Sequence, residues 1–354
     1  MPKVGHKVFA AALAALLINS SIAFAAKKSK KAEGQSVQVA SGKEPDWLYA
    51  KPAAYPESRY MTASGSAQFQ NSADNDALLN FASVFSQYVS SNQNANRKME
   101  QDREGSVSKE SSWEQNLNLR VDSSELIGVE IRERYFDGKK YHSLAVMDKE
   151  EAIKLYKSAI EANNKDIERL EAYTKGNSID RFSNLFIAQS KAAQNKNYLD
   201  RMFVINADQA KAIVLKSPDE IRALRVEVAK KIPVYVRVNG DKDSMAYAAL
   251  CELLNDYGFR VSKSQTERYS LLADFSLEQK LSKDKTSWQS FFSLSCALND
   301  SATSGALWTD SIKGRAASFN EEDSLDRAKM ALEKKVEGDL NDSFVNFLLG
   351  SVKN

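Results

Sequence analysis

The residue types that most often carry chemistry are scarce in this chain. Its 354 residues include two histidines, His6 and His142, and two cysteines, Cys251 and Cys296. These are too few for the common zinc sites built from histidine and cysteine. We therefore predict no metal ion and no cofactor. Catalysis through a histidine would have to use His142, because His6 falls in a segment that we expect to be removed.

Other residue groups could react or bind, and each has a simpler structural interpretation. Glu130 and Glu133 could form an acid/base pair, but residues an odd number of positions apart on a strand point to opposite faces, so these carboxylates should diverge. Residues 239–241, Asn-Gly-Asp, end a strand before a helix and could hold a phosphate, yet they lack the glycine pattern of a phosphate-binding loop. Residues 65–67, Gly-Ser-Ala, lack the second glycine of a nucleophile elbow. His142 lies on the apolar side of a strand and is interpreted as structural, so we predict no catalytic residue.

Cys251 and Cys296 both fall on apolar faces, one of a predicted helix and one of a predicted strand. In an oxidising compartment they could form a disulfide, and closing a loop of this length would stabilise the protein by roughly 3 to 4 kcal/mol in the chain-entropy model. The alternative is two buried free thiols. We favour that alternative, because nothing in the sequence fixes the close approach of the two Cα atoms that a disulfide needs.

The first 25 residues have the pattern of a secretory signal peptide. Lys3 and Lys7 precede an uncharged run over residues 8–18, and an Ala-Phe-Ala motif ends at Ala25, so cleavage is expected between Ala25 and Ala26. A membrane anchor is the alternative, but the run is shorter than the roughly 20 apolar residues that a span needs. No cysteine follows the run to accept a lipid. We expect a periplasmic protein without a direct transmembrane anchor.

The charge of the mature chain should be balanced. The whole chain has 49 Lys and Arg against 47 Asp and Glu, and the leader contributes Lys3 and Lys7 but no acid. Nucleic-acid and anionic-membrane binders usually carry a basic surplus, so both classes are disfavoured. The one dense basic patch lies within residues 26–44, whose polar composition predicts a disordered linker.

Residues 45–148 are expected to form a first α+β domain, with order beginning near Trp47. The predicted elements are a strand over 60–69, a helix from Leu78 to about 96 after cap-forming residues at 72–76, a strand over 126–136, a turn at 137–138 and a return strand over 140–147. Val129, Ile131 and Tyr135 should share one face of the second strand. Residues 97–123 fit no clear pattern.

The rest of the chain divides into a helical part and a second α+β part. Residues 149–231 show apolar spacings of three and four, broken at 176–177, which predict an antiparallel helical hairpin. The hairpin could be a protruding arm that docks a partner or a helical layer packed on its neighbours. Residues 232–354 predict strands over 233–238, 259–262, 271–280, 287–299 and 306–313, with helices over 244–257 and 321–349. The predicted fold class is α+β: two small sandwich domains, each with helices on a mostly antiparallel sheet, joined by the hairpin.

Residues 45–150 resemble the LPP-twenty family of bacterial envelope lipoproteins, a domain also found at the N-terminus of the flagellar H-ring protein FlgT. The resemblance rests on Pro45-Asp46-Trp47, on residues 60–67 (YMTASGSA), on the Ala77-Leu78-Leu79 helix that ends in residues 89–91, on residues 126–131 (LIGVEI) and on residues 140–147 (KYHSLAVM). The chain departs from the lipoprotein pattern because it lacks the acylated cysteine.

Residues 232–349 look, more weakly, like the N-terminal domain of TolB or the CsgG-like domains of envelope proteins. The matching residues are the strand over 234–238, the helix over 244–257 before Gly258-Phe259, and residues 299–310. Such domains serve as docking modules for envelope machinery, and they bring no catalytic residues to carry over.

The leading hypothesis is therefore an exported, non-enzymatic protein that binds other envelope proteins as an assembly or scaffold factor, in a flagellar or outer-membrane-associated setting. A homo-oligomer is compatible with this hypothesis. The first alternative is a small-ligand or glycan-binding module, in which exposed aromatics such as Trp113 or Trp288 stack on sugars. The second is a hydrolase, which would need a cleft with two facing carboxyl groups, one of them with a raised pKa.

Overall fold

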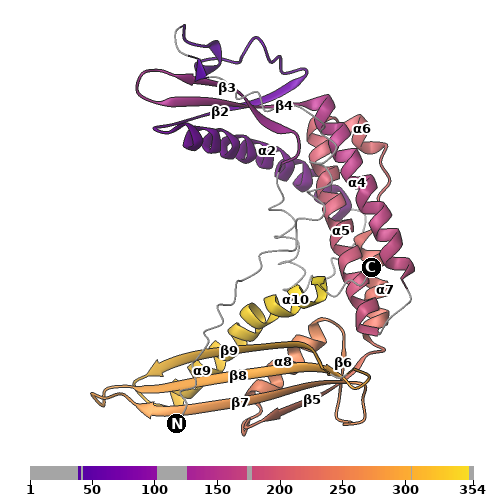
Figure 1. The fold of residues 1–354 in the computed structure, drawn as a ribbon, viewed down its shortest axis with the longest axis vertical. Coiled ribbons are helices and arrows are strands. Elements are labelled where there is room, and N and C mark those ends of the chain that lie inside the picture. Colours follow the sequence, from indigo (N-terminus) through magenta and orange to yellow (C-terminus); the bar gives the residue numbers. More distant parts are fainter. Residues whose placement is uncertain (1–38, 41–42, 102–125, 174–177, 304, 351–354) are drawn as a thin grey trace, which may run out of the picture. The chain divides into compact units, whose positions relative to one another are not determined.

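The computed structural model describes residues 39–40, 43–101, 126–173, 178–303 and 305–350. The predicted signal peptide with Ala25 and Ala26, the linker lysines at 27, 28, 30 and 31, and Trp113 lie outside the described residues. The fold is α+β, as predicted, with two sheets that each carry helices (Figure 1).

The first sheet has the strand order β1-β3-β4-β2. Its strands are β1 (Val39–Ala40), β2 (Tyr60–Ala67), β3 (Val129–Phe136) and β4 (Tyr141–Asp148). Helix α2 (Gln70–Gln101) covers one face through Phe81 and Phe85. The short helix η1 (Asp46–Leu48) brings Trp47 to the other face. β1 lies inside the segment predicted as a disordered linker and pairs in parallel with β3.

A bulge in β3 corrects the predicted alternation of that strand. Ile131 pairs with Ala145 of β4 and Glu133 with Leu144, so Arg132 is an extra residue without a partner. One extra residue reverses the face of every side chain that follows. Tyr135 therefore packs with Trp47, on the face opposite Ile131. For the same reason Glu130 and Glu133 share a face, and the prediction that they diverge is wrong.

Helix α2 begins earlier than predicted, at Gln70, so the expected cap-forming residues at 72–76 lie inside the helix, and acids among them make tertiary contacts. The Asp76 carboxylate accepts a hydrogen bond from the backbone N–H of Ser66 on the edge strand β2, at 2.8 Å. Asn80 donates to the Ser64 carbonyl of the same strand at 3.0 Å. These bonds occupy outward-facing backbone groups of β2, which would otherwise be open to pairing with another strand.

The helical part contains α4 (Lys149–Ala172), α5 (Ser178–Ile205), α6 (Ala207–Lys211) and α7 (Pro218–Ala229). The buried face of α4 is an apolar stripe with the spacings of three and four that were predicted for this segment, and Asn163 is its one polar member. Asn163 Nδ2 donates to the side-chain oxygens of Gln194 and Asn195 on α5, at 3.0 and 2.9 Å. This polar layer separates two apolar clusters and fixes the register of the helix pair.

Helix α5 is buried along most of its length. At one end Phe182 and Phe186 enter a core with Tyr257 and Phe259, and at the other end Met202 packs against α4. These contacts favour a packed helical layer over a free arm.

The second sheet has the order β6-β5-β7-β8-β9. Its strands are β5 (Pro233–Asn239), β6 (Arg260–Ser262), β7 (Tyr269–Leu281), β8 (Trp288–Asp300) and β9 (Ala306–Ser318). The accompanying helices are α8 (Met245–Asp256), α9 (Glu321–Lys335) and α10 (Asn341–Gly350), with a π-helical turn, η2 (Val336–Leu340), between the last two. All of these helices pack into the same apolar core, on one face of the sheet.

Gly65 allows α2 to lie directly on β2. A Cβ atom at this position would stand 2.1 Å from the backbone N of Ala77. We predict that Gly65→Ala destabilises the protein by about 1–3 kcal/mol, because backbone atoms must move to relieve the clash. Urea unfolding of the full chain measures the change.

Gly305→Ala is the matched control, because a Cβ there would meet nothing within 4 Å. Its effect should stay within about 0.5 kcal/mol. An unchanged unfolding midpoint for Gly65→Ala would contradict the close packing of α2 on β2.

Candidate functional site

His142 is a structural residue of the β3–β4 hairpin. Its Nε2 lies 3.0 Å from Asp137 Oδ2. Asp137 Oδ1 also accepts the backbone N–H groups of Lys139 and Lys140, each at 2.7 Å. The hydrogen bond from His142 and then those of the two backbone groups hold the pKa of Asp137 well below its usual range. The Asp137–His142 pair stabilises the turn, and these contacts include no nucleophilic side chain.

The proposed phosphate-binding junction at 239–241 is filled by the chain itself. Asp241 accepts hydrogen bonds from the backbone N–H groups of Met245 and Tyr247, at 2.9 and 2.7 Å. A carboxylate already neutralises the N-terminus of α8. Gly240 is required here for another reason: its φ is +78°, and a Cβ would meet the Phe275 carbonyl at 2.2 Å.

Neither cysteine is set up as a nucleophile. Both are free in the structure, Cys296 buried and Cys251 half-buried. Burial, followed by the neighbouring charge of Asp310, raises the pKa of Cys296 to about 12, and burial raises the pKa of Cys251. Both thiols stay protonated near neutral pH, whereas a reactive cysteine needs its thiolate.

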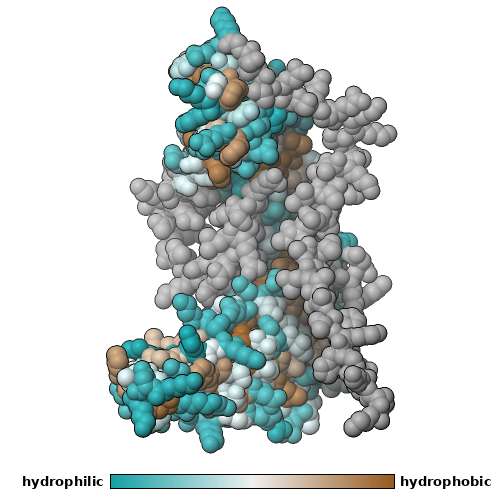
Figure 2. All heavy atoms as spheres, turned by 60° about the vertical axis from the view of Figure 1, so that its left-hand side comes forward, coloured by the Kyte–Doolittle hydropathy of each residue, from teal (hydrophilic) through white to brown (hydrophobic). Residues whose placement is uncertain are grey.

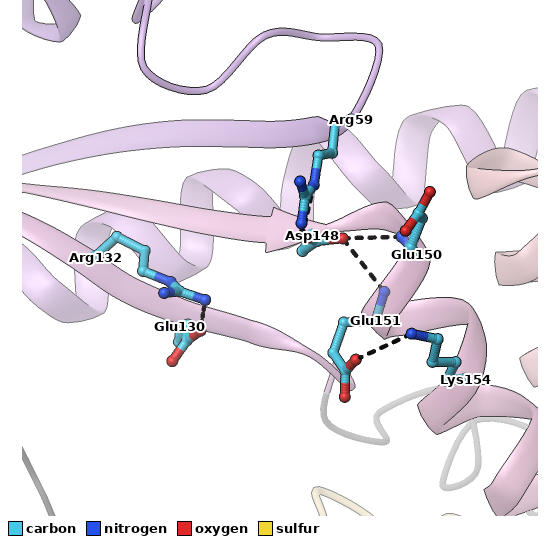
Figure 3. A network of polar contacts seen from close by, with 7 residues as sticks. All are labelled: Arg59, Glu130, Arg132, Asp148, Glu150, Glu151 and Lys154. Atoms are coloured by element: carbon cyan, nitrogen blue, oxygen red, sulfur yellow. Dashed lines mark hydrogen bonds and ion pairs between the residues drawn. The ribbon is translucent and has the colours of Figure 1, made fainter. Parts of the chain in front are cut away.

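A group of charged side chains surrounds the point where β4 passes into α4 (Figure 3). Asp148 accepts two hydrogen bonds from the Arg59 guanidinium, at 2.9 and 3.0 Å, and two from the backbone N–H groups of Glu150 and Glu151, at 3.0 and 3.3 Å. Burial raises the pKa of Asp148, but the hydrogen bonds from Arg59 and Glu151 outweigh burial, and the net shift is downward. Nearby, Glu130 pairs with Arg132.

These contacts cap α4 and tie it to the strand that precedes it. Glu133, the other half of the suggested acid/base pair, accepts the Trp47 indole N–H at 2.7 Å. Within the described ranges, no group of three or more His, Cys, Asp or Glu side chains is arranged to hold a metal ion. None of the described helices is both long and apolar enough to span a bilayer.

A small acidic depression lies between α8 and the α9–η2 segment. Glu252, Asp256, Glu333 and Glu337 line it. Burial and then the charges of Glu252 and Glu337 raise the pKa of Asp256. This is the kind of carboxyl that a hydrolase would use, but the depression has a volume of only about 20 Å³. That volume holds about one water molecule and no sugar ring, so the depression does not favour hydrolysis.

The second sheet has one face that no described helix covers, which we call the open sheet face. Strand alternation places every second side chain of β7 and β8, including Leu271 and Leu294, in the core. The residues between them point outward. The outward residues of the three long strands are Ser270, Leu272, Asp274, Ser276, Glu278, Lys280, Gln289, Phe291, Ser293, Ser295, Ala297, Asn299, Thr309, Ser311, Lys313, Arg315 and Ala317.

Hydroxyl and amide groups dominate the open sheet face. Across the strands, Ser276 pairs with Ser293 and their hydroxyls lie 2.8 Å apart, and Ser295 pairs with Ser311. In the space-filling view, the lower part of the molecule shows mostly teal and white residues with scattered brown ones (Figure 2). Trp288, the proposed sugar-stacking residue, is half-buried at the start of β8. Sequence reasoning singles out this tryptophan, but it does not identify the open sheet face.

Comparison with known proteins identifies the first sheet and its helix. The family model of the LPP20 lipoprotein matches residues 45–148. These residues form an LPP20 lipoprotein domain. No curated protein matches the chain.

Solved structures with a similar fold are distant. A secreted protein from Helicobacter pylori is 15% identical over 83% of this chain and 98% of its own, with a TM-score of 0.42. A minor lipoprotein from Acinetobacter baumannii is 11% identical over 33% of this chain and 90% of its own, with a TM-score of 0.24. A lipoprotein from Neisseria meningitidis is 14% identical over 32% of this chain and 99% of its own, also at 0.24. The resemblance of residues 232–349 to TolB or CsgG-like domains stays a prediction.

Asp148 ends the LPP20 domain and gives a pH-dependent prediction. Its pKa is lowered on folding, so its contribution to stability is present above the unfolded pKa of about 3.9 and is lost as the pH falls through the folded pKa. Asp148→Asn keeps a capping side chain but loses the charge. We predict that it lowers the free energy of unfolding by about 0.2–1 kcal/mol near neutral pH, with the difference shrinking as the pH approaches 3.

Urea unfolding at a series of pH values measures this difference. The matched control is Glu57→Gln, which removes the carboxylate of an exposed ion pair with Lys51 in the segment before β2, away from any helix terminus. Its effect should be close to zero at every pH. If the difference in free energy of unfolding between Asp148→Asn and the unaltered protein stays constant across the pH series, the Asp148 charge does not stabilise the fold.

Proposed function

We propose that this protein is an exported, non-enzymatic protein that binds other components of the bacterial envelope through its open sheet face, as an assembly or scaffold factor. The LPP20 lipoprotein domain supports the envelope setting. The observation that carries the proposal is the open sheet face itself: three strands of 13 residues present one side that no described helix covers.

The side chains that could react already form hydrogen bonds within the fold, which supports a non-enzymatic role. Asp137 binds His142 and two backbone groups, Asp148 caps α4, and Asp241 caps α8. An acid, a base or a nucleophile has to be placed against a substrate-sized cavity with a suitable pKa. The one carboxyl with a raised pKa, among those described, is Asp256, and its depression is too small.

In this proposal the two parts of the fold have different roles. The LPP20 domain and the helices α4 to α7 form the body of the protein, and the second sheet presents the docking surface. We place the protein in the periplasm, in a flagellar or outer-membrane-associated assembly. A pocket for a small ligand is a weaker candidate, because the acidic depression has no apolar wall large enough to bury one.

Site-directed photocrosslinking in cells tests the docking surface. A photoreactive amino acid replaces Thr309 or Ser311, both exposed on the open sheet face, and in parallel Met330, which is 67% exposed on α9. We predict that the two sheet positions, but not Met330, give crosslinked products that fractionate with the envelope. Mass spectrometry then identifies what is attached.

Equal crosslinking from Met330 and from the sheet positions would show that α9 is contacted as well as the open face. Recovery of every variant as an uncrosslinked species would overturn the docking function.

A further inference from the structure

The charges of the second sheet and its helices are sorted by face. On the open sheet face, the cations are Arg237, Arg260, Lys280, Lys313 and Arg315, and the anions are Asp274 and Glu278. Both anions are already engaged on the face itself. Glu278 forms an ion pair with Lys280 at 2.6 Å, and Asp274 accepts the Asn239 amide at 2.9 Å.

The cations of the edge strand β9 have no such partner. Lys313 and Arg315 are exposed on the outward side of β9, and within the part of the chain that the structure describes neither forms an ion pair. Arg315 stands across from Phe291, and Lys313 across from Ser293. Two cations therefore border a strip of hydroxyl groups and one half-exposed aromatic ring.

The helical side carries a cluster of acidic side chains. Glu252, Asp256, Glu333 and Glu337 line one depression there. Burial, followed by the charges of Glu252 and Glu337, raises the pKa of Asp256. A surface with a basic and an acidic side attracts an anionic partner to its basic side and repels it from the acidic side.

We propose that the open sheet face binds an anionic polysaccharide of the envelope. This inference rests on the proposed docking function and names the chemistry of the partner. Charge complementarity supports it, because Lys313 and Arg315 can pair with carboxylate or phosphate groups. The hydroxyl and amide side chains between the cations both donate and accept hydrogen bonds, as sugar hydroxyl groups do.

The same surface is a poor match for a membrane or for an apolar protein partner. The large apolar side chains that its long strands present are Leu272, which is 41% exposed, and Phe291, which is 36% exposed. Membrane-surface binding needs a continuous apolar face, and protein interfaces concentrate buried aromatic anchors at their centre. A sugar ring needs only a small apolar platform, which Phe291 supplies, surrounded by polar groups.

Binding of polygalacturonate, a polysaccharide of carboxylate-bearing sugars, tests the inference. Its fully methyl-esterified form has the same backbone without charge and serves as the ligand control. We expect the mature full chain to bind polygalacturonate in isothermal titration calorimetry, to bind the ester at least about tenfold more weakly, and to lose affinity as salt is raised from about 50 to 200 mM.

Two double variants assign the binding to a face. Lys313→Glu with Arg315→Glu reverses the charges on β9, and Lys329→Glu with Lys334→Glu makes the same change of net charge on exposed positions of α9. We expect the β9 variant to bind polygalacturonate at least about tenfold more weakly and the α9 variant to change affinity less than about twofold. Thermal unfolding confirms that both fold, and Lys313→Gln with Arg315→Gln replaces the β9 variant if it does not.

The inference is overturned by absence of binding to polygalacturonate, by equal binding to the ester, or by equal losses in the β9 and α9 variants. Binding to phosphatidylglycerol vesicles that matches or exceeds binding to polygalacturonate would also overturn it in favour of a lipid surface. If Thr309 or Ser311 crosslinks to an envelope protein while polygalacturonate does not bind, the docking function stands and the polysaccharide is excluded.

Discussion

The burial of α5 is the constraint on which the rest of the structure depends. Its Phe182 and Phe186 enter the core of the second sheet, and Met202 enters the core that α2 and α4 share. Each fully buried side chain of this size contributes about 1.5–3 kcal/mol. The buried guanidinium of Arg225 stacks on the same two phenylalanines, with ring-centroid distances of 5.4 and 5.9 Å. A hairpin held in this way is part of the body of the protein.

Ion pairs and hydrogen bonds of carboxylates hold elements of both sheets together. Asp74 receives two hydrogen bonds from Arg134, at 2.9 and 3.1 Å, and one from Ser143 at 2.6 Å, which joins α2 to the middle of the first sheet. Asp300, buried in the second sheet, receives both arms of Arg268 at 2.8 Å, and that guanidinium holds the pKa of Asp300 below its usual range. Carboxylates engaged in this way stabilise the fold.

The distribution of charge matters more for function than its sum. A mature chain with balanced charge argues against a polyanion binder only if the charges are evenly mixed. Here strand alternation places Lys313 and Arg315 on one side of the sheet, while Glu252 and Glu337 lie with the helices on the other side. A chain with 49 basic and 47 acidic residues, which nearly balance, can thus present a basic surface.

The sequence by itself determined the elements, because helix and strand periodicities are local. The stripe of α4, the Asp137-Gly138 turn with φ +92° at Gly138, and the alternation of β7 and β8 can all be found from residue spacing. Only the tertiary structure decided the rest. The bulge at Arg132 turns Tyr135 to the other face, although its own residues alternate regularly. Asp241 occupies the helix terminus that a ligand could have used, and α8 to α10 all choose one face of the second sheet. Register, capping partner and the choice of face depend on contacts between residues far apart in the chain, and no local pattern encodes them.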